Sequence, residues 1–212
     1  NLILQGGKSM TVGDQTLHYD PATYFVMSVG LPAAGSVRPG PSGEPYLAVA
    51  LMLDPAVLAG LLAQLPETAN HDNQPAGFSV AAVTPELMDA WVRMLRLMER
   101  PAEIAALAPV YEREILFRVL QGPHGAMLRA IAAQGTAVAR GNLAIDSLRR
   151  DYAQPLRVEA LAQKASMSTS AFHRHFKAVT SLSPLQYQKQ IRLLQARTLL
   201  ISQGRSVSAA AY

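Results

Sequence analysis

The sequence predicts an α+β chain of two domains: a small antiparallel β-domain with covering or dimerisation helices at residues 1–135, and an all-helical domain at 136–212. Three observations support this division. Short strand-like segments fill the first third of the chain, helical periodicity begins at residue 54, and positive charge gathers near the C-terminal end. At 212 residues, half of them apolar, the chain can form two modest domains with ordinary hydrophobic cores.

Short segments rich in β-branched and aromatic residues alternate with turn residues in the first third of the chain. Gly6–Gly7, Gly13–Asp14 and Asp20–Pro21 are predicted turns, and the Gly-, Pro- and Ser-rich stretch 35–45 is a predicted loop. The predicted strands are Leu2–Leu4, Ser9–Val12, Gln15–Tyr19, Tyr24–Val29 and Tyr46–Leu53. Such short strands at close spacing predict a small antiparallel barrel or sandwich.

Helices are predicted from residue 54 onward. Asp54 is a predicted N-cap and Pro55 a first-turn proline, so a helix to Leu65 divides the apolar stretch 46–65 into parts too short to span a membrane. A polar loop at 67–77 and a strand at 78–83 follow, and further helices are predicted at 84–98, 101–121 and 124–134. These helices either cover the β-domain or form a two-fold seam. We favour the seam and expect a homodimer.

Residues 157–180, RVEALAQKASMSTSAFHRHFKAVT, predict two short helices joined by a tight turn. The first helix has apolar residues at one-face spacing: Val158, Leu161, Ala162 and Ala165. Ser166–Ser168 interrupts it, and Ser168 is a natural N-cap for the second helix. That helix has one apolar side, formed by Phe172, Phe176 and Val179. Its opposite side carries four polar residues: Ser170, His173, Arg174 and Lys177.

A helix that is anchored by two aromatic rings and presents such polar groups suits the major groove of DNA. The pattern alone is also typical of an ordinary amphipathic surface helix. The distribution of charge favours DNA binding. Residues 1–140 hold 9 Lys and Arg against 12 Asp and Glu, a net of −3, whereas residues 141–212 hold 10 against 3, a net of +7. A basic segment attached to a mildly acidic one is expected of a domain that binds a polyanion.

The flanking C-terminal segments also read as helices. We predict one helix from about residue 143 to 152, and another from Pro184 to about Ser202, after a turn at Ser181–Ser183. The second of these has apolar residues on two sides, which predicts packing between two subdomains. The chain starts without Met in an apolar run and ends in what reads as the start of a helix, so we expect it to be part of a longer protein.

No feature of the sequence predicts catalysis. The chain has no cysteine, which excludes disulfides and thiolate metal sites, and no secretory leader is visible. His173 and His175 are about 200° apart on a helix, so they cannot share one metal ion. The predicted β-domain has the single histidine His18, too few for a metal-dependent enzyme of the barrel type. We therefore expect no enzyme activity, no cofactor and no metal.

Three segments resemble a known family. SMSTSAFHRHFKAVTSLSPLQYQKQIRLLQARTLLI resembles the first half of the AraC/XylS-type DNA-binding domain, with its SxSxxFxRxFK…SPxxYxxxxRLxxAxxLL pattern. LILQGGKSMTVGDQTLHYDPATYFVMSVGLP with EPYLAVALMLDP, and PVYEREILFRVLQGPHGAMLRAIA, resemble the AraC-type N-terminal regulatory domain, a cupin-like barrel. The resemblance implies a dimeric, cytoplasmic transcription regulator. It also implies two helix-turn-helix subdomains joined by a long helix, the second of them largely absent from this chain.

The resemblance also assigns roles to residues of the second helix, 169–180. It places Ser170, His173 and Arg174 at base-reading positions. Thr169, Lys177 and the backbone at Ser168 are then candidates for phosphate contacts. The implied partners are double-stranded DNA, RNA polymerase and a small effector whose identity the sequence does not reveal. The alternative is a cupin-type ligand-binding protein or enzyme whose helical tail serves as an interaction module.

Overall fold

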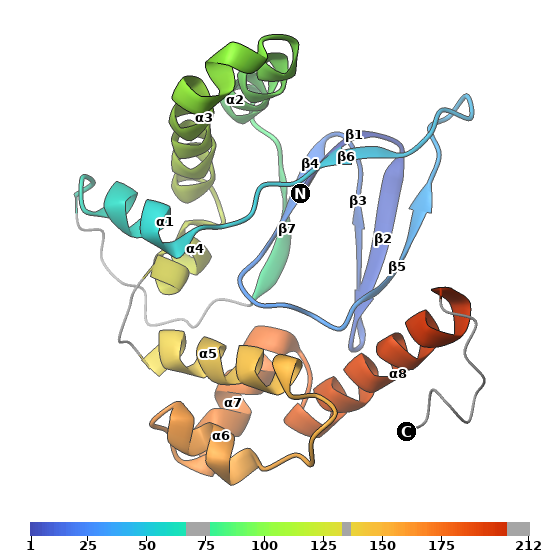
Figure 1. Cartoon of the computed structure of the whole chain (residues 1–212), viewed down its shortest axis with the longest axis vertical. Coiled ribbons are helices and arrows are strands. Elements are labelled where there is room, and N and C mark those ends of the chain that lie inside the picture. Colours follow the sequence, from blue (N-terminus) through green and yellow to red (C-terminus); the bar gives the residue numbers. More distant parts are fainter. Residues whose placement is uncertain (67–76, 133–136, 203–212) are drawn as a thin grey trace.

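The computed structural model describes residues 1–66, 77–132 and 137–202. Two parts are visible in Figure 1: strands with the helices α1 to α4 on one side of them, and a group of helices, α5 to α8, at one end of the molecule. We call residues 1–132 the N-terminal part and residues 137–202 the helix-turn-helix part. This arrangement confirms the predicted α+β class with a helical C-terminal region.

The described strands form two antiparallel sheets. One has the order β6-β1-β4-β7 and the other the order β3-β2-β5. The strands are β1 (Leu2–Gln5), β2 (Gly7–Val12), β3 (Gln15–Tyr19), β4 (Thr23–Met27), β5 (Ala34–Arg38), β6 (Leu47–Val49) and β7 (Phe78–Ala82). Between the sheets lies a core that includes Ile3, Met10 and Phe25. The predicted small barrel or sandwich therefore takes the form of two facing sheets.

Two predictions about this region need correction. The stretch 35–45 was expected to be a loop, yet Ala34–Arg38 forms β5 and pairs with β2 from Gly7 to Thr11. All five residues of β5 are exposed, so no apolar alternation marked the strand, and backbone pairing alone forms it. The strand expected at Tyr46–Leu53 is shorter, because only Leu47–Val49 pairs with β1.

Neighbouring residues of β4 contribute to two different cores. Phe25 packs between the sheets, whereas Tyr24 and Val26 face the helices, as the period of two in a strand requires. The second core joins the four-stranded sheet to all four helices of the N-terminal part, through residues such as Leu58, Trp91 and Leu128. The helices therefore cover one face of this sheet, as the first of the two sequence-based interpretations proposed.

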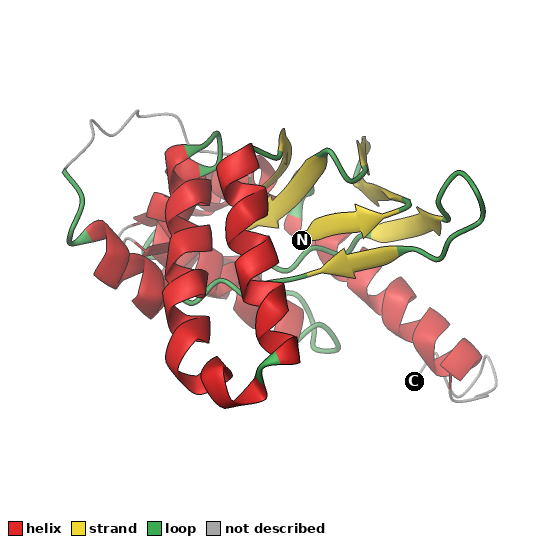
Figure 2. Cartoon of the chain, turned by 90° about the horizontal axis from the view of Figure 1, so that it is seen from above, coloured by secondary structure: helices red, strands yellow, loops and turns green. Residues whose placement is uncertain are grey.

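The four helices begin and end close to their predicted limits. They are α1 (Pro55–Leu62), α2 (Pro85–Arg96), α3 (Pro101–Gln121) and α4 (Gly125–Ala132), with the short 3₁₀ helix η1 (Leu97–Glu99) between α2 and α3. The Asp54 carboxylate accepts a hydrogen bond from the Ala56 N–H at 2.7 Å, and the Thr84 hydroxyl accepts one from the Leu87 N–H at 3.2 Å. α2 packs against α3, and Figure 2 shows two long helices side by side.

Some predicted features lie outside the described residues: most of the loop at 67–77, the last turn of the helix predicted to reach residue 134, and the chain beyond residue 202. None of the described helices combines the length and the apolar character needed to cross a membrane.

His124 fixes the start of α4 against the four-stranded sheet. Its side chain is buried, with Nδ1 3.0 Å from the Tyr24 hydroxyl of β4 and Nε2 3.2 Å from the Ser79 carbonyl of β7. A carbonyl can only accept, so Nε2 carries the hydrogen in the neutral ring and Nδ1 accepts from Tyr24. Burial lowers the pKa of His124, which favours this neutral form. β4 and β7 are thus joined through one imidazole.

Candidate nucleic-acid interface

Four helices surround a separate hydrophobic core in the helix-turn-helix part. They are α5 (Ala137–Arg150), α6 (Val158–Lys164), α7 (Thr169–Thr180) and α8 (Pro184–Ser202). α5 starts six residues before the predicted start at Leu143, which corrects that prediction. Gly141 lies inside this extra length, and it is needed there because an added Cβ would overlap the ring of His175 on α7. The glycine therefore marks a close contact between helices and not a helix boundary.

The turn between α6 and α7 adopts the predicted conformation. Ser166 has a φ of 53°, in the left-handed region that reverses the chain direction in a few residues. The Met167 N–H donates to the Ala162 carbonyl at 2.9 Å, which closes the end of α6. The Ser168 hydroxyl then accepts a hydrogen bond from the Ala171 N–H at 3.2 Å, as predicted for the N-cap of α7.

One side of α7 is fully buried. Phe172 and Phe176 are 0% exposed, and their ring centroids lie 5.6 Å apart in an edge-to-face arrangement. Phe176 makes a second edge-to-face contact, at 5.2 Å, with Tyr187 of α8. Such pairs stabilise a core beyond the burial of their area. These contacts fix the rotation of α7 about its axis and so decide which residues face outward.

The outward side of α7 carries every residue that the sequence suggested for DNA contact. The exposed residues of this set are Ser168, Thr169, Ser170, His173, Arg174 and Lys177. Ser170, His173, Arg174 and Lys177 lie on the side opposite the aromatic anchors, and Ser168 and Thr169 lie at the N-terminal end of the helix. Together the six form a polar, basic surface, which we call the reading face. Neither Arg174 nor His173 points into the core. Burial of these two side chains would have excluded a role in reading DNA.

The two histidines of the His-Arg-His sequence lie on opposite sides of α7. His173 is exposed, whereas His175 is 4% exposed and lies against Gly141. His175 is thus buried on the apolar side of the helix. Burial lowers the pKa of His175. Across the described residues, no three or more His, Cys, Asp or Glu side chains are grouped so that they could hold a metal ion.

The end of α7 and the start of α8 form a tightly bonded corner. The Thr180 hydroxyl donates to the Phe176 carbonyl at 2.7 Å and accepts from the Leu182 N–H at 3.2 Å, and Ser181 has a left-handed φ of 61°. Beside this corner is a hollow of about 360 Å³. Lys177 lines it from α7, and Gly13 and Asp14 line it from the β2–β3 hairpin. The N-terminal part therefore reaches the margin of the reading face.

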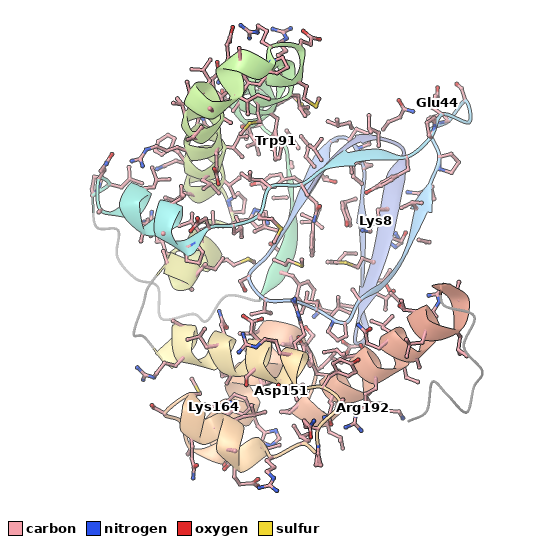
Figure 3. All side chains as sticks on the ribbon, in the orientation of Figure 1. Lys8, Glu44, Trp91, Asp151, Lys164 and Arg192 are labelled. Atoms are coloured by element: carbon pink, nitrogen blue, oxygen red, sulfur yellow. The ribbon has the colours of Figure 1, made fainter. Side chains whose placement is uncertain are left out.

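Two polar side chains of α8 have a structural function that the sequence did not reveal. Arg192 donates to the carbonyls of Tyr152, Ala153 and Gln154 at 2.8–3.2 Å. Gln188 donates to two of the same carbonyls. Figure 3 shows Arg192 on α8 and Asp151 at the end of α5, just before this segment. These bonds hold the α5–α6 connection against α8. Their cause is tertiary, because the partners are 34–40 residues apart.

The turn, the buried aromatic side and the exposed basic side together define a helix-turn-helix, here joined to a two-sheet domain. Comparison with known families agrees. Residues 1–127 match the family model of the AraC-type transcriptional regulator N-terminus, and residues 161–212 match that of a helix-turn-helix domain. The chain belongs to the AraC-type transcriptional regulators.

Similar proteins include the HTH-type transcriptional activator RhaS of Salmonella schwarzengrund (strain CVM19633) and of Salmonella agona (strain SL483). Each is 32% identical to this chain over 123 residues. The match covers 57% of this chain and 43% of each relative, so it spans under half the length of these curated relatives.

Proposed function

We propose that this chain is the regulatory part and first helix-turn-helix subdomain of a sequence-specific, DNA-binding transcription regulator, with α7 in the major groove. The observation that carries the proposal is the reading face: four polar residues exposed on the side of α7 opposite two fully buried phenyl rings, with exposed Ser168 and Thr169 at the N-terminal end of the helix. A rigidly oriented helix can bring such side chains to base edges and phosphates. Membership of the AraC-type family supports the same function.

Within the reading face we propose two kinds of contact. Ser170, His173 and Arg174 read bases, and the guanidinium of Arg174 suits a bidentate contact with guanine, which is worth about 1–3 kcal/mol of discrimination. Thr169, Lys177 and the backbone at Ser168 bind phosphates. The Ser168 hydroxyl already caps α7, so its backbone N–H is the group left to make that contact.

A selection from random duplex DNA tests this proposal. The 212-residue chain is expected to enrich one sequence motif and to bind it more tightly than a scrambled duplex across a salt series. The Arg174→Ala variant should lose preference at one base pair, whereas Lys177→Ala should weaken all duplexes equally and reduce the salt slope by about one. Arg100→Ala, an exposed arginine between η1 and α3, is the matched control and should change neither.

Two results of this selection would contradict the proposal. Steep salt dependence without any enriched motif would indicate only general affinity for polyanions. Unchanged base preference with uniformly lower affinity in Arg174→Ala would make Arg174 a phosphate contact and not a base-reading residue.

We also propose the remaining features that the family implies. Residues 1–135 form a regulatory domain that senses a small effector or mediates dimerisation, and residues 136–212 form the DNA-binding domain. The relatives are named transcriptional activators, which supports RNA polymerase as a further partner and the cytoplasm as the site of action. Equilibrium dialysis with candidate effectors tests the sensing function, because bound effector should change the affinity of the chain for the enriched DNA.

We propose that the chain forms a homodimer through α3. The N-terminal half of this helix exposes Ile104 and Val110 at 41% and 56%, among exposed alanines. An apolar exposed surface of this kind is typical of an interaction site. Sedimentation of the wild type and of a Val110→Glu variant tests the seam, since only the wild type should sediment as a dimer.

The alternative function is a cupin-type ligand-binding protein or enzyme with a helical interaction tail. The family match argues against it, and we propose that the chain has no enzyme activity. An enriched DNA motif in the selection above would exclude the role of a simple interaction module for α5–α8.

A further inference from the structure

One end of the β4–β7 pair leaves the N-terminal part and enters the helix-turn-helix part. The two strands pair antiparallel up to Met27 opposite Phe78. One residue further on, Ser28 donates to the Gly77 carbonyl twice, from its N–H at 2.7 Å and from its hydroxyl at 3.1 Å. The pairing therefore continues past the sheet as a stiff projection. Figure 1 shows this end of β7 close to α5 and α7.

The projection supplies an apolar side chain to the core of the helix-turn-helix part. Val29 is 4% exposed and belongs to the same buried cluster as Phe172, Phe176 and Tyr187. Leu31 packs against this cluster and also against the core between the two sheets. The core beneath the reading face is thus completed by Val29, which follows β4 and lies more than 100 positions earlier in the chain.

Two hydrogen bonds join the projection to α7 and α8. The Gly77 N–H donates to the Val179 carbonyl in the last turn of α7 at 3.0 Å. The Tyr187 hydroxyl of α8 donates to the Gly30 carbonyl. Both acceptors are backbone carbonyls, and the bond to Gly30 is partly buried, where an unpaired polar group is costly. The end of α7 is therefore held directly by the N-terminal part.

Glycine allows the two parts of the chain to approach so closely. A Cβ added at Gly77 would overlap the Val179 carbonyl oxygen, and one added at Gly30 would overlap the guanidinium of Arg149 on α5. At the tip of the β2–β3 hairpin, Gly13 has a φ of 62° and lies against Ser181 and Leu182. Three loops of the N-terminal part thus meet α5, α7 and the start of α8 at glycines.

We propose that residues 28–31 together with Gly77, which we call the core plug, complete the hydrophobic core of the helix-turn-helix part and hold α7 in its reading orientation. The reading face stays exposed while the plug is in place, so the docked arrangement is the one that is competent to bind DNA. Any movement of β4 and β7 within the N-terminal part shifts the plug and loosens α7. The docking of the core plug does not depend on the proposed function. Only the effect of the plug on DNA binding rests on the proposed function.

Hydrogen exchange on the whole chain tests the core plug. In a Val29→Thr variant, which keeps the shape of the side chain but buries a hydroxyl, exchange of the α7 and α8 amides should become roughly tenfold faster. Amides of α2 and α3 should keep their rates. The matched control is Val37→Thr, the same substitution at a 54% exposed position of β5, and it should change neither set. Unaltered exchange in α7, or equal acceleration in α2 and α3, would overturn the proposal.

Two further measurements separate the docking from DNA binding. Tyr187→Phe keeps the ring against Phe176 but removes the bond to Gly30, so it should accelerate exchange in residues 28–31 and in α8. In addition, Val29→Thr should bind the enriched duplex several-fold more weakly than Val37→Thr. If the wild type bound no DNA at all, the proposed function would be wrong. The hydrogen-exchange result would still show whether the core plug docks. Equal DNA affinity of Val29→Thr and Val37→Thr would show that the core plug does not affect DNA binding.

Discussion

Truncation of Phe176 to alanine would remove the ring that joins α7 to α8. The ring is 0% exposed and makes edge-to-face contacts with Phe172 at 5.6 Å and with Tyr187 at 5.2 Å. Loss of a buried phenyl ring costs about 3–5 kcal/mol, through lost transfer free energy and the cavity left behind. Each aromatic pair adds about 0.5–1.5 kcal/mol. Because both pairs are lost together, we expect the free energy of unfolding to fall by an amount in the upper part of the truncation range, about 4–5 kcal/mol.

Urea denaturation measures this loss with two signals. Circular dichroism follows all helices, whereas the fluorescence of Trp91, the single tryptophan, reports the core between α1–α4 and the sheet (Figure 3). We expect the helical signal of Phe176→Ala to change at lower urea than the Trp91 signal. The control is Leu143→Ala, at a 65% exposed position of α5, which should stay within about 0.5 kcal/mol of the wild type. A loss below about 1 kcal/mol for Phe176→Ala would show that the buried side of α7 is wrongly assigned.

Two further predictions concern pH and capping. Burial lowers the pKa of His124 and of His175 in the folded chain, so the unfolded chain binds more protons below the ordinary histidine pKa. The free energy of unfolding should therefore fall as the pH drops below about 6.5, and His124→Gln should reduce this slope in denaturation measured at several pH values. Ser168→Ala removes the cap of α7 and should cost about 1 kcal/mol in the same assay, whereas Ser170→Ala, two residues later on the exposed side, should be close to neutral. A flat pH profile, or equal effects of the two serine variants, would contradict these assignments.

Local patterns account for the features that the sequence predicted well. Capping residues interact with N–H groups two or three positions away, so Asp54, Thr84 and Ser168 marked three helix starts that the structure confirms. The 3.6-residue period placed Phe172 and Phe176 on the buried side of α7 and Arg174 on the exposed side. Such relations depend only on the geometry of one helix and can be read before the fold is known.

The features that the sequence did not predict depend on distant partners. β5 is held to β2 by backbone bonds, and all its residues are exposed. Its side chains therefore show no alternation of apolar and polar residues that would have predicted a strand. The helix predicted to start at about residue 143 begins at Ala137, and Gly141 within it allows a close contact with His175, 34 positions later. Arg192 is bound to carbonyls about 40 residues away.

By itself, the sequence determined the two-part α+β build, the helix-turn-helix and the identity of the residues on the reading face. The roles of Ser170, His173 and Arg174 toward bases stay predictions. Only the tertiary structure decided that Val29 and Gly77 belong to the support of α7. No sequence pattern around Val29 or Gly77 indicates this contact. The contact forms only when the end of the β4–β7 pair meets the core of the helix-turn-helix part. Periodicity reports which side of a helix is buried, but it cannot name the residue that buries it.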